Sequence, residues 1–266
     1  RPAIIFTKHN SKSSNSLGNW LRARRGTDRV IAVSAHTHDL LLRSPYRRVP
    51  IDVVRNGIDL QHYAPATAQD AASMRAAWTH DPDALILASS AGTDPHKGWI
   101  DLVRAVARMA PDIAAHVHIV VAGKPIGTAL LEEVRTLGMA DRFHYAGLVD
   151  DVRPVIAGAD AGFVLSWDIE TISFACREMM AMGKPVMASN YAGLPENIHV
   201  GQDGWVVPAR DVEAIARQVE RLYQQRGQLS AMGRAARAHA EDAFGQELFC
   251  AETLRTYAQA IAGARR

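Results

Sequence analysis

Short apolar runs, each followed by a segment of helical periodicity, recur along the whole chain and constrain its fold more than any other feature. The runs have the length of strands and cover residues 3–7, 30–33, 51–54, 85–88, 117–122, 143–146, 161–165, 185–188 and 205–207. Residues 99–109 and 212–222 place apolar side chains on one helical face, and Asp211 is suited to cap the second helix. Strands that alternate with helices predict an α/β fold with a Rossmann-like, doubly wound parallel sheet.

These elements divide the chain unevenly. A polar turn at residues 56–59 follows the third run, and residues 61–245 contain a complete Rossmann-like pattern. Residues 1–60 contain too few strands for a stable sheet of their own, so we expect them to be the end of an incomplete amino-terminal domain. Residues 246–266 predict a final helix with an apolar stripe over residues 246–262.

Charge is concentrated at the start of the chain. The net charge is +2, yet residues 1–55 carry +8, from eleven Lys and Arg side chains and three Asp side chains. The basic residues between 22 and 48 predict an anionic neighbour, which the charge alone leaves open: lipid headgroups, an anionic acceptor or nucleic acid. A solvated helical face explains the same residues equally well.

Several classes of protein are excluded by composition. No run approaches the length of a membrane-spanning helix, and no signal-peptide core follows Arg1. Cys176 and Cys250 are too few for a disulfide framework or a four-thiolate zinc site. These features favour a reducing, cytoplasmic setting.

Two glutamates flank the beginning of an apolar helical pattern. Glu170 and Glu178 lie in a segment that follows a strand and ends at Gly183 and Pro185. A helix that begins near Ile172 would place Glu170 in the loop before it and Glu178 inside it. Two such glutamates alone are usually capping or surface groups. Backbone N–H groups at the positive end of the helix nevertheless predict an anion site at the carboxyl edge of the sheet, where a diphosphate fits. These groups belong to Thr171, Ile172, Ser173 and Phe174.

The order of motifs resembles that of the retaining glycosyltransferases of family 4, two-domain enzymes of the GT-B type. Their hallmark is a Glu, seven residues and a second Glu, followed by a small-Gly-x-Pro-Val strand; Glu170, Glu178 and residues 182–186 match it. Further matches occur in the same order over nearly the whole chain: Val33-Ser34, Asn56-Gly57-Ile58-Asp59, Lys97-Gly98, Ala122-Gly123, Ala146-Gly147, Gly193-Leu194-Pro195-Glu196 and Asp203-Gly204.

The resemblance implies roles for individual residues. Glu170 is expected to contact the donor sugar, Lys97 to balance charge on the departing diphosphate, and His9 to face the sugar from the amino-terminal part. Glu178 is expected to bind the ribose, and the base is expected near residues 145–151. The expected donor-binding residues are Glu178, Thr171, Ile172, Ser173, Phe174, Thr93, Gly147 and Asp151.

One position departs from the family pattern. Family members usually have Gly-Arg ahead of the phosphate-binding lysine, and Thr93 stands where that arginine is expected. We expect Lys124 or an arginine from elsewhere to supply the missing cation.

Motifs for metal binding are weak in this sequence. The pair Asp81 and Asp83 is typical of a solvated turn, and the spaced histidines at 36, 38, 116 and 118 lack a suitable third ligand nearby in the sequence. We therefore expect neither a metal nor a cofactor.

The resemblance implies a retaining transferase that moves a sugar from a UDP- or GDP-sugar to a cell-surface saccharide or lipid-linked acceptor, as in lipopolysaccharide biosynthesis. The alternatives are a GT-B nucleotide-sugar epimerase and a non-catalytic module that binds nucleotide sugars. We expect a cytoplasmic enzyme that contacts the inner face of an anionic membrane through residues 22–48, with no nucleic-acid partner.

Two structural expectations also follow from the resemblance. Family members have a longer amino-terminal domain, so we expect this chain to be the carboxyl-terminal part of a longer enzyme. In GT-B enzymes the last helix crosses back to the amino-terminal part. We therefore expect Phe249 and Tyr257 to be buried around Trp20 and Leu21.

Overall fold

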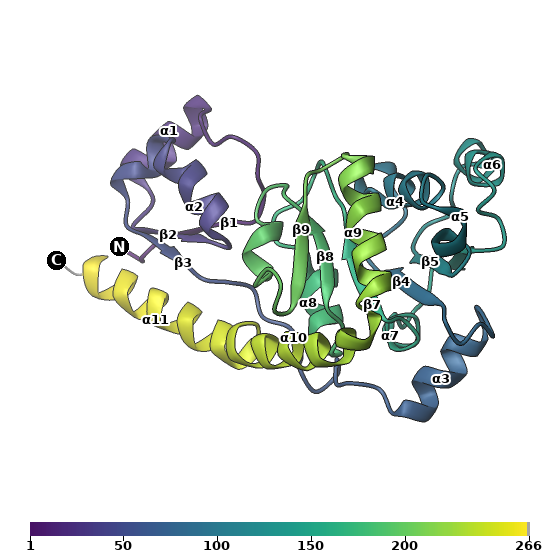
Figure 1. Ribbon diagram of the computed structural model, residues 1–266. Helices are drawn as coiled ribbons and strands as arrows, with labels where there is room; N and C mark the ends of the chain where they lie inside the picture. The colour runs from purple at the N-terminus through teal and green to yellow at the C-terminus, as the bar shows by residue number, and fades with distance from the viewer. Residues whose placement is uncertain (265–266) are drawn as a thin grey trace.

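Two parallel sheets of unequal size organise the chain in the computed structural model, which describes residues 1–264 (Figure 1). The smaller has the order β1-β2-β3, formed by β1 (Ile5–Lys8), β2 (Arg29–Ala32) and β3 (Ile51–Val53). The larger has the order β6-β5-β4-β7-β8-β9. Its strands are β4 (Leu85–Ser89), β5 (Val117–Ala122), β6 (Phe143–Gly147), β7 (Ala161–Val164), β8 (Val186–Ser189) and β9 (Gly204–Val207). The prediction of a Rossmann-like parallel α/β fold is confirmed, and each predicted apolar run forms a strand.

Helices cover both faces of the larger sheet. They are α3 (Ala68–Ala76), α4 (Trp99–Val106), α5 (Pro111–Ala114), α6 (Thr128–Thr136), α7 (Arg153–Ala157), α8 (Phe174–Ala181), α9 (Val212–Gln224) and α10 (Leu229–Ala243). Single turns of 3₁₀ helix are η2 (Pro95–Lys97), η3 (Leu194–Asn197) and η4 (Arg226–Gln228). The smaller sheet carries α1 (Leu17–Arg25), α2 (Ala35–Leu42) and η1 (Pro45–Arg48), and α11 (Gln246–Ala264) ends the described chain.

Burial on both faces explains why β4, β5, β7 and β8 read as mostly apolar runs, whereas the edge strands β6 and β9 are partly exposed. In β4, Leu85 and Leu87 pack with α4, α6 and α9, whereas Ile86 and Ala88 pack towards α7 on the other face. The face beyond β7 is covered by α8 and α10, which pack against each other. The helix predicted to begin at Val212 does so, and the Asp211 carboxylate accepts a hydrogen bond from the Ala214 N–H at 2.9 Å.

The chain crosses between the sheets twice, at the turn of residues 56–59 and at the junction of α10 and α11, and these two crossings lie side by side. Ile58 donates to the Phe244 carbonyl at 2.8 Å and accepts from the Gln246 N–H at 3.1 Å. A Cβ atom on Gly57 would lie 2.5 Å from the Gln246 Cα, so only glycine allows this close approach. The polar turn at 56–59 and the α10–α11 junction therefore act as one paired connection.

The final helix reaches the smaller sheet, as expected, but through different side chains. In Figure 1, α11 continues beyond α10 and ends beside the three-stranded sheet, and it contacts β2. Its buried residues are Thr256 and Ala260, which are four positions apart and share one face. Tyr257 is 43% exposed and Phe249 is half-buried, while Trp20 and Leu21 are exposed. The predicted aromatic contact is therefore wrong, because α11 turns small residues rather than its aromatic ones towards the sheet.

No helix within residues 1–264 is both long enough and apolar enough to cross a membrane.

Candidate functional site

The carboxyl edges of the two sheets face each other. The Thr171 hydroxyl, in the loop after β7, donates to the His9 carbonyl, just after β1, at 3.1 Å. The Glu196 carboxylate, beyond β8, accepts the N–H groups of Ala35 and His36 at the beginning of α2, both at 2.7 Å. Ligands of open α/β sheets bind at such carboxyl edges, so the two facing edges, called the cleft below, are the candidate site.

The order of the larger sheet reverses between β4 and β7, and Lys97 and Glu170 meet at this point. Lys97 lies in the turn after β4 and Glu170 in the loop after β7. The Lys97 Nζ is 3.1 Å from the Glu170 Oε2, and both side chains are largely buried. Two residues 73 positions apart are thus paired where a doubly wound sheet forms its ligand crevice.

Gly98 allows the lysine turn to pack against the end of β7. Its φ of +75° favours glycine, and a Cβ there would lie 2.1 Å from the Leu165 carbonyl oxygen. The close backbone contact therefore requires the glycine of the Lys97-Gly98 motif, whatever the ammonium group of Lys97 does.

The Glu170 loop is held by its own carboxylate. The Glu170 Oε1 accepts the N–H groups of Thr171 at 3.1 Å and Ser173 at 3.2 Å, and Oε2 lies 3.3 Å from the Ser166 hydroxyl. Ile169 and Ser173 have φ values of +47° and +53°, a conformation that costs energy for a side chain with a Cβ. This loop is thus strained and tied to one acidic group.

The helix predicted to begin near Ile172 begins at Phe174, which is a correction of two residues. Ser173 is its N-cap, and its side chain accepts the Cys176 N–H at 3.3 Å. Of the backbone donors predicted to be free for a diphosphate, those of Thr171 and Ser173 are bonded to Glu170 instead. Ile172 is buried and Phe174 is 47% exposed.

Glu178 lies on α8 and has Tyr63 as its partner. Burial raises the pKa of Glu178 above its ordinary value of 4.5, and the hydrogen bond from Tyr63 opposes this shift. Burial, followed by the charge of Glu178, raises the pKa of Tyr63 to about 12. Sequence reasoning missed Tyr63, because it lies in the segment after the 56–59 turn and carries no motif.

A pocket of about 310 Å³ opens at the ends of β4, β5 and β6. Thr93 and Lys124 line it, but the Thr93 hydroxyl donates to the Lys124 carbonyl at 2.6 Å. The Thr93 carbonyl accepts the Trp99 indole N–H at 2.8 Å. Thr93 therefore fixes the loop, and Lys124 is the basic side chain at the pocket. Gly147 ends β6 with a φ of +82°, and its carbonyl accepts the Gly123 N–H at 2.9 Å.

Asp151 and His9, two of the predicted site residues, do not line the pocket of about 310 Å³. The Asp151 carboxylate is paired with the Arg153 guanidinium at 2.7 Å, and this hydrogen bond keeps the pKa of Asp151 below its ordinary value. Its neighbours Val149 and Val152, not Asp151, line the pocket of about 310 Å³. His9 is exposed in the cleft at the end of β1, where its backbone contacts Thr171.

Arg177 was not predicted, although it is the one arginine in the apolar helix pattern of 174–181. Its side chain is fully buried, and Nε donates to the Asn197 Oδ1 at 2.8 Å. Another N–H donates to the Asn56 carbonyl, and the guanidinium lies over the Phe244 ring. Burial lowers the pKa of Arg177 to about 10. Arg177 thus joins α8 to both crossings between the sheets.

Comparison with known proteins adds a family match. The family model described as Glycosyl transferases group 1 matches residues 83–225, and the model described as Glycosyltransferase Family 4 matches residues 1–62. The chain is 32% identical over 252 residues to the D-inositol 3-phosphate glycosyltransferase of Streptomyces bingchenggensis, covering 90% of this chain and 54% of the relative. It is 30% identical to that of Kribbella flavida, covering 86% of this chain and 56% of the relative. The chain thus spans about half the length of the curated relatives it matches.

Solved structures share the fold at low sequence identity. A glycosyltransferase from Rickettsia africae superposes with a TM-score of 0.83 at 18% identity, covering 96% of this chain and 70% of the other. HepE of Anabaena, in complex with UDP, gives a TM-score of 0.84 at 21% identity, covering 96% of this chain and 72% of the other.

Proposed function

The chain belongs to the family described as Glycosyl transferases group 1, and from this we propose that it carries the donor site of a retaining glycosyltransferase. The observation that carries the proposal is the Lys97–Glu170 pair, 3.1 Å apart where the order of the larger sheet reverses. A cation for a diphosphate and a carboxylate for sugar hydroxyls stand together there, next to the beginning of α8.

We propose that the donor is a nucleotide-diphosphate sugar whose base enters the pocket of about 310 Å³ at the ends of β4, β5 and β6. Lys124 at this pocket takes the place of the arginine that Thr93 replaces. Glu178, beside Tyr63, binds the ribose hydroxyls. Solved structures of the same fold are named as complexes with UDP and UDP-glucose, which makes UDP the first probe to use.

The proposed transfer keeps the anomeric configuration. The bond between the anomeric carbon and the diphosphate oxygen breaks, and the acceptor hydroxyl attacks that carbon from the same face. The acceptor proton passes to the departing phosphate oxygen. Glu170 steadies the positive charge that develops on the sugar, and Lys97 balances the negative charge that grows on the diphosphate. His9, exposed across the cleft, faces the sugar.

The proposed acceptor carries a free hydroxyl and comes from the amino-terminal side of the cleft. A cell-surface saccharide or a lipid-linked sugar, as in lipopolysaccharide biosynthesis, is the class we propose. The curated relatives are named for D-inositol 3-phosphate, so a phosphorylated polyol belongs in the same acceptor panel.

We further propose that the protein works in the cytoplasm and touches the membrane through the basic residues of its amino-terminal part. A pocket of about 480 Å³ there is lined by Trp20, Arg24, Arg43, Arg47 and Arg48. Arg24 precedes β2, and Arg43 to Arg48 precede β3, so these side chains lie away from the carboxyl edge that faces the cleft. This position supports a membrane-facing surface rather than part of the donor site.

Sedimentation with vesicles tests the membrane contact. We expect the protein to bind phosphatidylglycerol vesicles and not phosphatidylcholine vesicles. This binding should weaken as salt is added and in the double variant Arg47→Ala plus Arg48→Ala. Arg135→Ala, which removes an exposed arginine on α6, is the matched control. Equal losses for both variants would refute the assignment.

Calorimetry with UDP and GDP, combined with a radiolabelled transfer assay, tests the proposed activity. Binding together with transfer, and a product whose anomeric configuration matches that of the donor, is expected. Binding without transfer to any acceptor in the panel would instead support a binding module. Conversion of the donor sugar itself without an acceptor would support an epimerase.

A further inference from the structure

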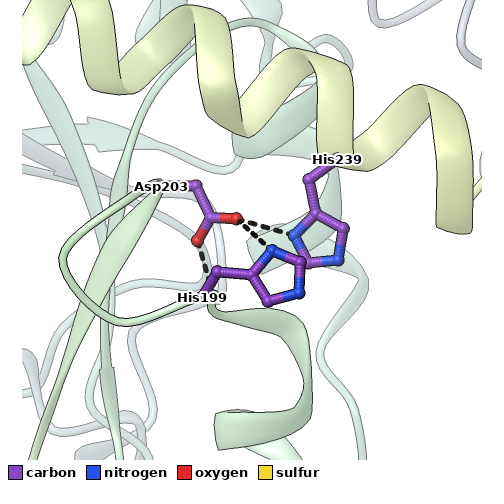
Figure 2. A group of neighbouring side chains, drawn as sticks. All are labelled: His199, Asp203 and His239. Atoms are coloured by element: carbon purple, nitrogen blue, oxygen red, sulfur yellow. Dashed lines mark hydrogen bonds and ion pairs between the residues drawn. The ribbon is translucent and has the colours of Figure 1, made fainter.

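His199, Asp203 and His239 converge at one point that includes neither Lys97 nor Glu170 (Figure 2). His199 follows η3, Asp203 immediately precedes β9, and His239 lies on α10. Figure 2 shows both imidazole rings turned towards the same carboxylate. Asp203 belongs to the Asp203-Gly204 match, but no motif joins it to the two histidines, because His239 lies 36 positions after Asp203.

The three side chains present a compact set of ligand atoms. The His239 Nδ1 is 2.7 Å from the Asp203 Oδ2, and the His199 Nδ1 is 3.2 Å from the same oxygen. One nitrogen or oxygen from each residue lies within 4.8 Å of the others. The two rings are stacked with centroids 3.9 Å apart, and His239 also packs against Phe244.

The buried carboxylate requires compensation for its charge. Asp203 is 1% exposed, and its Oδ1 accepts the His199 backbone N–H at 2.7 Å. Within residues 1–264, the ion-pair partners of Asp203 are the two histidines, with no lysine or arginine among them. A buried carboxylate is costly unless its charge is compensated, and a bound cation provides that compensation.

We propose that His199, Asp203 and His239 bind one divalent ion of the zinc class. Two imidazole nitrogens and one carboxylate oxygen form a donor set suited to Zn²⁺ or Co²⁺, with an open position for water. The set opens into a cavity of about 530 Å³ whose other charged or polar lining residues are Arg55, Glu196, Gln202 and Asp242.

Other histidines within residues 1–264 lack one part of this set. His116 bonds to Asp81 at 2.5 Å and stacks on Tyr223, without a second histidine. His118 and His144 stack on each other as a histidine pair. The group around Asp203 is the one in the described residues that brings three such ligands together.

The proposed ion lies beside the connection between the two sheets. His239 packs on Phe244, whose carbonyl accepts the Ile58 N–H in the paired crossing. An ion held by these three residues ties the loop before β9 to α10. Because the ion binds the folded chain, it raises the apparent melting temperature in proportion to its affinity and concentration.

Calorimetry with zinc chloride on the metal-free protein tests the proposal, and cobalt absorption reports the geometry of the site. One equivalent of Zn²⁺ is expected to bind and raise the melting temperature. His199→Asn is expected to weaken binding by at least about tenfold, because one of three ligands is lost. Its side chain is 59% exposed, so this change removes the stacking on His239 but little buried packing. His239→Gln, a second variant, is expected to do the same.

His116→Asn is the matched control, since it breaks a similar histidine–aspartate pair without the third ligand. It is expected to retain the affinity of the unchanged protein. Magnesium and calcium, which prefer oxygen ligands, are expected not to compete. Absence of zinc binding, or binding that survives both His199→Asn and His239→Gln, would overturn the proposal. Loss of binding in His116→Asn as well would also overturn it. None of these results bears on sugar transfer.

Discussion

The ammonium group of Lys97 lies 3.1 Å from the carboxylate of Glu170, across the point where the order of the larger sheet reverses. Each group thereby compensates the charge of the other in a largely buried position. We propose that the two groups act on different parts of the donor. Removing one of them leaves the charge of the other uncompensated.

Replacing Glu170 by Gln is expected to separate catalysis from binding. The turnover number in the active enzyme should fall by about a hundredfold or more, because an electrostatic stabiliser of the transition state is lost. The affinity for free UDP should stay the same or rise, since Lys97 no longer has a carboxylate partner. Steady-state kinetics and UDP calorimetry provide the two measurements. A variant with near-normal turnover and an unchanged melting temperature would refute the role of Glu170.

Replacing Glu178 by Gln is expected to change the pH dependence of stability. Burial raises the pKa of Glu178 above 4.5, so the folded chain keeps this proton while the unfolded chain releases it. The free energy of unfolding therefore falls as pH rises from about 4.5 through the raised pKa, and Glu178→Gln should remove this fall. Melting temperatures over that pH range provide the measurement. Glu132→Gln, an exposed change on α6, should follow the unchanged protein. Parallel curves for all three proteins would contradict the prediction.

Replacing Gly98 by Ala is expected to displace the lysine turn. The new Cβ would lie 2.1 Å from the Leu165 carbonyl oxygen at a φ of +75°, which should cost about 3 kcal/mol or more. Denaturant unfolding measures this loss. The control is Gly18→Ala in α1, where a Cβ would lie 3.9 Å from the Ser16 hydroxyl at an ordinary contact distance, and it should be neutral or stabilising by about 0.5 kcal/mol. Equal stability of the two variants would show that the turn tolerates a side chain.

Replacing Glu196 by Ala is expected to loosen the contact between the two sheets. Its carboxylate accepts two N–H groups at the positive end of α2, at 2.7 Å each. Their loss should cost about 2 kcal/mol. Calorimetric unfolding should then show the smaller sheet melting earlier than the larger one. Glu213→Ala removes an exposed carboxylate from the first turn of α9 and serves as the control. A single unshifted transition for Glu196→Ala would refute the coupling.

Local pattern determined which segments of this chain become strands and helices. The run 117–122 is apolar except for the buried His118 because β5 is buried on both faces. A helix with its cap at Asp211 follows from one capping side chain and a 3.6-residue period. The family resemblance carried by Glu170, Glu178 and Lys97-Gly98 likewise predicted which residues form the proposed donor site before any strand order was known. Burial and backbone geometry leave such marks on neighbouring residues, so the sequence carries them directly.

Only the tertiary structure decided which side chains meet. α8 begins at Phe174 rather than at Ile172, because Ser173 adopts a positive φ and the Glu170 carboxylate takes two backbone donors. The face of α11 that packs inward is set by the three-stranded sheet beneath it, so Thr256 rather than Tyr257 is buried. His239 reaches Asp203 because α10 lies next to the loop before β9. Such contacts depend on strand order and helix rotation, which sum many weak interactions over the whole chain and therefore leave no local signature.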